Sequence, residues 1–209
     1  ELPTTSLNHL LPDAPPDAIK AKRDAAGVSL VNYGLAALPD EEERHHVFEF
    51  ARKMGIETIV AEPPLDTLDI VENLCAEYGL KVAIHNHPDP SIYWNPDTVV
   101  EACAGRSACI GACADTGHWV RSGKDPLEAL KSLEGRIVSL HIKDVDRYAP
   151  DAADVAWGTG VGNVKALLEE VHRQGIQPVF SIEYEGPDDQ DPLPEVAQCV
   201  EYFNTVRDE

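Results

Sequence analysis

The sequence predicts a parallel α/β fold from three observations. Strand-like and helix-like segments alternate six times, and the strand-like segments are continuously apolar, as in a sheet covered on both faces. Residues of metal-ligand type stand at the carboxyl ends of several strands, where parallel α/β proteins place their chemistry. A (β/α)8 TIM barrel gathers such ends around one point. We therefore expect a single barrel domain over residues 1–209, with its first strand and helix absent, and a doubly wound open sheet as the alternative.

The expected helices are marked by their ends. Prolines or acidic residues open several of them, and glycines close four, with apolar residues between them. In chain order the expected helices span residues 15–26, 39–54, 66–78, 95–104, 126–133, 164–174 and 194–206.

The expected strands are the short apolar runs between these helices. In chain order they span residues 28–33, 57–61, 81–84, 108–115, 137–142 and 179–184, and residues 1–3 are the possible tail of an earlier strand. Residues 148–163 are expected to form a long loop near the barrel mouth. Its glycines at 158, 160 and 162 lack the spacing of a dinucleotide-binding loop and the lysine of a phosphate-binding loop.

Composition excludes several classes of partner. The net charge of −20 disfavours nucleic acid and anionic membrane surfaces, and no apolar run reaches the roughly 18–20 residues that span a bilayer. Five cysteines without a CxxC pair favour reduced thiols, and Cys113 is expected to be buried. We expect a cytoplasmic protein, although an exported form stays open.

Three strand ends supply ligand types for one divalent metal ion. Asp115, His141 and Glu183 are a mixed oxygen and nitrogen set, which suits Mn²⁺, Mg²⁺, Co²⁺, Fe²⁺ or Zn²⁺, and we favour Mn²⁺. A fourth ligand is expected from an earlier strand. The candidates are Glu62, His85 and His87.

Other polar and aromatic residues are expected near this set. His118 lies in the predicted loop three residues after Asp115, where it could bind metal or substrate or orient the aspartate. Lys143 should share the face of His141 and could hold an oxyanion or shuttle a proton, unless it pairs with Asp144. Arg147 could clamp a polar substrate. Trp119 could form an aromatic wall for a sugar ring, or it could be a packing anchor.

These motifs resemble the xylose isomerase-like TIM barrel superfamily, which includes sugar phosphate isomerases and epimerases, inosose dehydratases and endonuclease IV. The matching stretches are 115–118, 139–144, 158–163 and 181–185. The resemblance implies metal ligands Glu, Asp, His and Glu on four strands, a substrate-binding His118 and a loop arginine, Arg147. The departure is at the first ligand, where residues 85–87 read His-Asn-His.

The expected function is that of a metal-dependent sugar isomerase or epimerase. It would remove a proton next to a carbonyl through a metal-held enediolate, with Glu183, His87 or His118 as the base. One alternative is a metal-dependent dehydratase or lyase acting on a keto sugar or an inosose-like substrate. A second is a non-catalytic sugar-binding barrel. The expected partner is a small-molecule sugar, and a homo-oligomer is possible.

Overall fold

The computed structural model describes residues 16–27, 29–186 and 191–208, so the strand expected at residues 1–3 lies outside the described chain. The described residues form two compact units. The first contains the residues up to 85 together with 102–111, and the second contains 86–101 and 112–208. Helix α5 (Pro96–Cys103) and strand β4 (Ile110–Asp115) run from one unit into the other.

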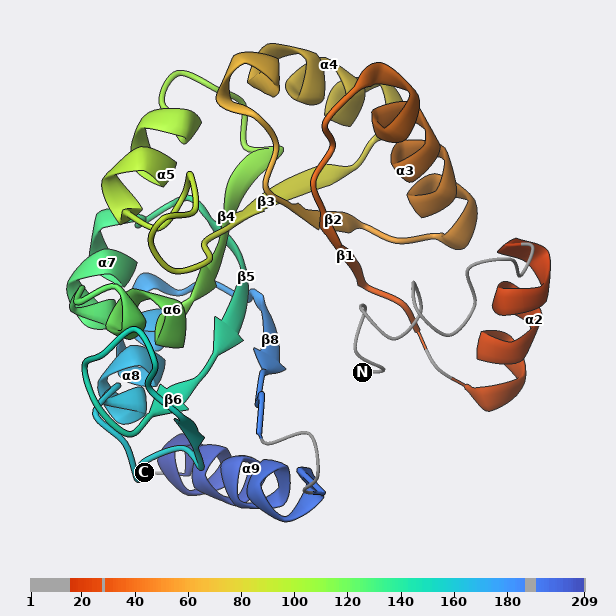
Figure 1. The fold of residues 1–209 in the computed structure, drawn as a ribbon. Coiled ribbons are helices and arrows are strands. Elements are labelled where there is room, and N and C mark those ends of the chain that lie inside the picture. Colours follow the sequence, from red (N-terminus) through yellow and green to blue (C-terminus); the bar gives the residue numbers. More distant parts are fainter. Residues whose placement is uncertain (1–15, 28, 187–190, 209) are drawn as a thin grey trace. The chain divides into compact units, whose positions relative to one another are not determined.

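The first unit is a parallel β/α arrangement built on three strands (Figure 1). Strand β1 pairs with β2 at Asn32↔Thr58, and β2 pairs with β3 at Thr58↔Lys81. In chain order its elements are α2 (Pro16–Ala26), β1 (Asn32–Ala36), α3 (Glu41–Met54), β2 (Thr58–Ala61), η1 (Leu65–Thr67), α4 (Leu68–Tyr78) and β3 (Lys81–His85).

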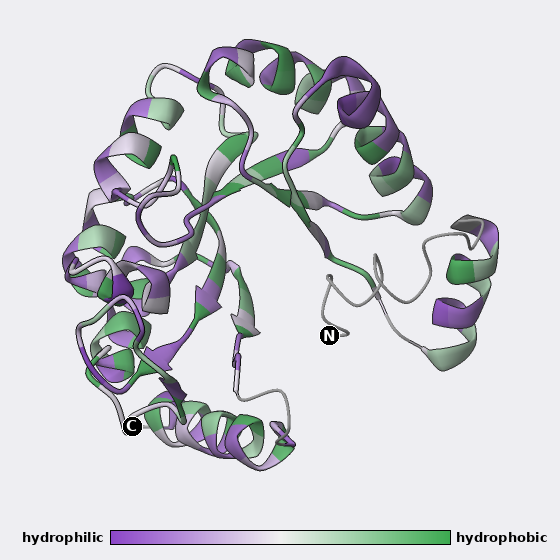
Figure 2. Ribbon diagram, viewed as in Figure 1, coloured by the Kyte–Doolittle hydropathy of each residue, from purple (hydrophilic) through white to green (hydrophobic). Residues whose placement is uncertain are grey.

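Helix α3 shows how sequence and packing agree in this unit. The Asp40 carboxylate caps its first turn by accepting from the Glu43 N–H at 2.9 Å, and Gly55 ends it in the left-handed conformation. Figure 2 shows hydrophilic and hydrophobic residues on different sides of this helix. The buried apolar side consists of Val47, Phe48, Ala51 and Met54.

The second unit pairs β4, β5 and β8 in parallel, and this register positions the site. Asp115 lies opposite His141, and His141 lies opposite Ser181. Glu183 is the first residue after β8, and its N–H donates to the carbonyl of Ile142, the last residue of β5. The other elements in chain order are α6 (Thr116–Arg121), α7 (Pro126–Ser132), β5 (Ile137–Ile142), β6 (Asp144–Val145), β7 (Asp154–Val155), α8 (Val164–Gln174), β8 (Val179–Ile182) and α9 (Leu193–Arg207).

The predicted helices and strands are confirmed to within two residues at their ends, except for the first strand. The β-branched run at 28–33 predicted the wrong position for the first strand, because pairing with β2 decides where β1 lies. Gly34 lies inside β1, and a Cβ there would approach the Val60 carbonyl oxygen to 2.2 Å. This close backbone approach requires glycine inside the strand, where the register with β2 is irregular.

Two further short elements replace segments that were expected to be loop. Residues 116–121 form α6 directly after β4, and residues 154–155 pair antiparallel with 144–145 as a small ladder, β6–β7. Both are too short to show helical or alternating periodicity in the sequence. Among the helices of the described residues, none combines the length and apolarity needed to cross a membrane.

Candidate metal centre

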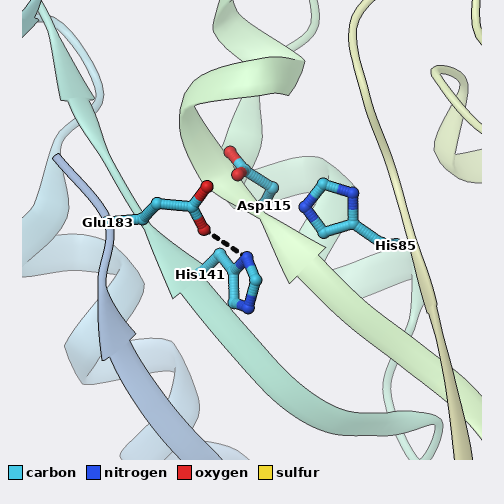
Figure 3. A group of neighbouring side chains, drawn as sticks. All are labelled: His85, Asp115, His141 and Glu183. Carbon is cyan, nitrogen blue, oxygen red and sulfur yellow. Dashed lines mark ion pairs between the residues drawn. The ribbon is translucent and has the colours of Figure 1, made fainter. Parts of the chain in front are cut away.

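Three side chains at the carboxyl ends of β4, β5 and β8 meet in the second unit. One ligand atom from each of Asp115, His141 and Glu183 lies within 4.8 Å of the other two. The His141 Nδ1 and the Glu183 Oε2 are in direct contact, as the dashed line in Figure 3 shows. The structure therefore brings together the three ligands that were expected from successive strand ends.

Without a metal ion, the cluster holds a proton on His141, and a metal ion would have to displace that proton. Burial lowers the pKa of His141, but Cys113 and Glu183 outweigh burial and raise it to about 11. Burial raises the pKa of Glu183, but His141 and Lys143 outweigh that effect and lower it to about 2. An imidazole and two carboxylates form a mixed nitrogen and oxygen donor set, which fits a divalent transition metal or Mg²⁺.

Asp115 also begins a helix. Its Oδ1 accepts from the His118 N–H at 2.9 Å, which makes it the N-cap of α6, and its side chain is fully buried. The Asn86 side chain bonds both the N–H and the carbonyl of Asp115, each at 2.9 Å. His118, expected in a loop, therefore lies in the first turn of a helix, which corrects that prediction.

Lys143 is the buried cation of the site. Its Nζ lies 2.8 Å from Glu185 Oε2, 3.1 Å from Glu183 Oε1 and 3.3 Å from Asp115 Oδ2, and the side chain is fully buried. His118 Nε2 lies 3.1 Å from the same Nζ. Burial lowers the pKa of Lys143, but the three carboxylates raise it above its usual value, so the amine stays charged.

Local packing fixes where Lys143 lies. Both its N–H and its carbonyl bond the Thr116 hydroxyl at 3.0 Å. A Cβ on Gly117 would lie 2.5 Å from the Lys143 Cβ, so glycine makes room for the lysine stem. The alternative pairing of Lys143 with Asp144 is not observed. Asp144 instead accepts the N–H groups of Val145, Gly158, Gly160 and Gly162, and thereby shapes the glycine-rich loop.

Sequence reasoning missed the polar layer behind these residues. The Arg121 guanidinium lies 3.3 Å from His118 Nδ1 and 2.6 Å from Asp154 Oδ1. Asp154 Oδ2 accepts the Glu185 N–H at 2.6 Å. Two signals could have found part of this layer, since Arg121 lies one helical turn after His118 and Glu185 lies two residues after Glu183. Asp154, on a two-residue strand, carries no such signal.

The candidates for a fourth ligand lie around residue 85. In the first unit, His85 ends β3, and its Nδ1 lies 3.3 Å from Glu62 Oε1 just after β2. A carboxylate in this position can orient a metal-binding imidazole. In the second unit, the His87 ring lies 5.3 Å from the His118 ring between centroids.

Two residues that were expected to contact substrate are buried or paired with other residues. Trp119 is 0% exposed, so its ring offers no surface to a sugar, and the packing alternative for this residue holds. The Arg147 guanidinium bonds Asp146 and Asp151 of its own loop, and its side chain is half exposed. Cys113, expected to be a buried thiol, is fully buried and has no disulfide.

Comparisons with known proteins agree with the parallel β/α fold. The family model described as "Xylose isomerase-like TIM barrel" matches residues 1–205. An inosose dehydratase of Bacillus thuringiensis (strain Al Hakam) is 31% identical over 86 residues, which are 41% of this chain. The match spans only 29% of that relative's length.

Solved structures share the fold over most of the chain. An uncharacterised protein from Parabacteroides distasonis has a TM-score of 0.70 and 36% identity, with 92% of this chain and 78% of that chain covered. The IolI protein with a bound zinc atom has a TM-score of 0.73 and 18% identity, with 96% and 84% covered. The family model, the parallel β/α order and the fold of these neighbours lead to one conclusion: the chain belongs to the xylose isomerase-like TIM barrel family.

Proposed function

We propose that this chain is a divalent-metal-dependent sugar isomerase or epimerase that removes a proton next to a carbonyl group. The observation that supports this most directly is the cluster of Asp115, His141 and Glu183 at neighbouring strand ends. His85 is the proposed fourth ligand, with Glu62 orienting its ring. Asn86, the residue after His85, bonds the backbone of Asp115 through its side chain.

The metal, when bound, would polarise the substrate carbonyl and acidify the neighbouring C–H. The proteins of the family include one solved with zinc, and the donor set here suits several divalent ions. Asp115, His141 and Glu183 would hold the ion. The acidic surface, with a net charge of −20, favours a neutral sugar over a phosphorylated one.

The proton chemistry would fall to the residues around the cluster. Glu183 is one proposed base, although its contacts with His141 and Lys143 make it a weak one while they last. His87 is the other, since its half-buried ring lies beside His118. Lys143 lies within 3.1 Å of Glu183, Glu185 and His118, and because its amine stays charged, it suits holding an oxyanion better than shuttling a proton.

Metal content is the first test. Elemental analysis should find about one divalent ion per chain in the wild type and a loss of that ion in His141→Ala. His172→Ala, an exposed histidine on α8, is the matched control and should keep the ion. Protein that binds no metal even after exposure to Mn²⁺, Mg²⁺ and Zn²⁺ would refute the proposal.

Hydrogen exchange is the second test. The metal-loaded protein is incubated in D₂O with a panel of keto sugars, and deuterium is sought on the carbon next to the carbonyl. Incorporation that disappears in Glu183→Gln, but not in the control Glu201→Gln on exposed α9, supports the proposal. Bound metal with no exchange on any sugar would favour the non-catalytic sugar-binding alternative.

Dehydration is the second candidate, and two observations favour it. The curated relative with a matching segment is an inosose dehydratase. Elimination also needs an acid for the departing hydroxyl, and the Lys143 ammonium beside His118 is the proposed donor, although the carboxylates that raise its pKa make it a weak acid while they surround it. Adding an inosose to the panel separates the two candidates. A dehydratase removes water from the substrate, so its product has a lower mass and is an enone that absorbs in the ultraviolet. An isomerase or epimerase gives a product of unchanged mass.

A further inference from the structure

We propose that Cys75 and Cys109 are an oxidisable dithiol pair, which a peroxide converts to a disulfide in the folded protein. Both cysteines belong to the first unit, Cys75 on α4 and Cys109 directly before β4. The pair is separate from the metal centre and does not depend on the proposed function. Three features of the first unit support it: the docking of the two segments, the contact between the two thiols, and the unequal burial of the two side chains.

Residues 106–109 are held against α4 by charged hydrogen bonds to one carboxylate. The Arg106 Nη1 lies 3.1 Å from Glu72 Oε2, and the Ser107 N–H donates to Glu72 Oε1 at 2.7 Å. Cys75 follows Glu72 by three residues on the same helix, so its side chain lies one turn further along the same face. The carboxylate therefore fixes the two segments side by side next to Cys75.

The two thiols meet where these segments pack together. The Cys75 and Cys109 side chains are hydrogen-bonded to each other. The backbone beside them is also shared, because the Val82 N–H donates to the Cys109 carbonyl at 2.8 Å and bonds the Cys75 sulfur. The Ser107 hydroxyl lies 2.9 Å from the Cys109 Sγ. Two sulfurs in contact on backbone that is fixed in this way need little movement to form a bond.

The unequal burial of the two cysteines decides which one a peroxide reaches. Cys109 is half-buried, whereas the other four cysteines of the chain are buried. Cys75 is 1% exposed, and burial raises the pKa of its thiol, with Cys109 and Glu72 adding to the rise. Oxidation begins at an accessible sulfur, so Cys109 reacts first and Cys75 is the buried partner behind it.

Two steps convert the pair to a disulfide. The Cys109 thiolate attacks one oxygen of hydrogen peroxide, the O–O bond breaks, and hydroxide leaves, so that Cys109 becomes a sulfenic acid. The Cys75 sulfur then attacks the Cys109 sulfur, the S–O bond breaks, and the departing hydroxide takes the Cys75 thiol proton to form water. In sum, two thiols are oxidised to one disulfide while one peroxide is reduced to two waters.

Mass spectrometry of the oxidised chain tests the pair and needs no substrate. The folded protein is treated with a small excess of hydrogen peroxide at neutral pH, its free thiols are alkylated in denaturant, and the chain is digested. We expect a peptide pair linked through Cys75 and Cys109 that dithiothreitol separates, and the number of free thiols per chain should fall from five by two. A thiol count that stays at five, or Cys109 oxidised without a link to Cys75, overturns the proposal.

Variants test the order of the two steps. Cys75→Ala should stop oxidation at the sulfenic acid of Cys109, which dimedone then labels, and Cys109→Ser should leave all four remaining thiols free after the same treatment. The control Cys103→Ala removes another buried cysteine of the first unit and should keep the linked peptides. A disulfide that still forms through Cys75 in Cys109→Ser overturns the pairing. If Cys75→Ala does not fold, Cys109→Ser decides, because it replaces the half-buried sulfur with an oxygen of similar size.

Discussion

Replacing Lys143 with methionine tests how the buried carboxylates of the site are held together. Methionine keeps most of the stem that packs against Gly117 and removes only the charge. Asp115 would be left fully buried without its cation, and Glu183, whose side chain is 30% exposed, would lose one of its two cationic partners. Removing one partner of a buried ion pair costs far more than removing an exposed one.

The expected loss is about 3 kcal/mol of unfolding free energy, at the lower end of the range for a broken buried pair. Glu185 adds little, because its side chain is 57% exposed and Arg121 stays beside it. For a domain of this size, about 3 kcal/mol lowers the melting temperature by roughly 6–12 °C. The folded-state pKa of Lys143 is raised, so its stabilisation is complete below the unfolded value near 10.4 and is lost only as pH rises through the folded value.

Thermal unfolding of metal-free protein, followed by circular dichroism, measures this loss. Because Lys143 stays charged, the difference from the wild type should be constant between about pH 6 and 9. The control Lys131→Met removes an exposed partner of Glu128 on α7 and should cost less than about 1 kcal/mol. Added Mg²⁺ or Zn²⁺ should stabilise Lys143→Met more than the wild type, since a cation replaces the missing charge. A melting temperature within about 2 °C of the wild type would refute the reasoning.

Three further substitutions test the packing around the site and the pairing of the buried Glu170 with Arg173. Gly117→Ala should destabilise the protein by about 1–3 kcal/mol in a denaturant titration despite the better helix propensity of alanine, because its Cβ meets the Lys143 stem; a more stable variant would contradict this. Asp144→Asn should cost about 3 kcal/mol and speed proteolysis within residues 158–162, since an amide cannot accept all the loop N–H groups that the carboxylate accepts. Glu170→Gln should cost about 1 kcal/mol at neutral pH, because it breaks the pairing with Arg173. The pKa of Glu170 is lowered to about 2, so this difference should shrink as pH falls from about 4.5 toward 2, and a difference independent of pH would show that Arg173 is not its cause.

Local sequence signals were enough to predict most of the fold and the core of the candidate site. Apolar runs and helix-ending glycines mark the elements, because both reflect interactions within a few residues. The proximity of Asp115, His141 and Glu183 could be predicted, because parallel strands bring their carboxyl ends to one edge of the sheet. Lys143 followed from strand periodicity, since it lies two residues after His141.

The rest depends on contacts between distant segments. Arg121, Asp154 and Glu185 come from a helix, a two-residue strand and the end of β8, and only the folded chain joins them. Trp119 was expected near substrate because a loop tryptophan and a buried helical one look alike in sequence. Burial is decided by the packing of α6, which the sequence did not predict.

Helix α6 was missed because one residue serves two purposes. Asp115 ends an apolar strand, and that position made it a metal-ligand candidate, yet an aspartate before Thr-Gly-His is equally an N-cap signal. The structure shows that the two roles do not compete. Oδ1 caps the helix through the His118 N–H, and Oδ2 faces Lys143 and His118. The capping bond fixes the carboxylate plane and therefore orients the second oxygen, so the strand-to-helix junction itself holds the proposed ligand rigidly.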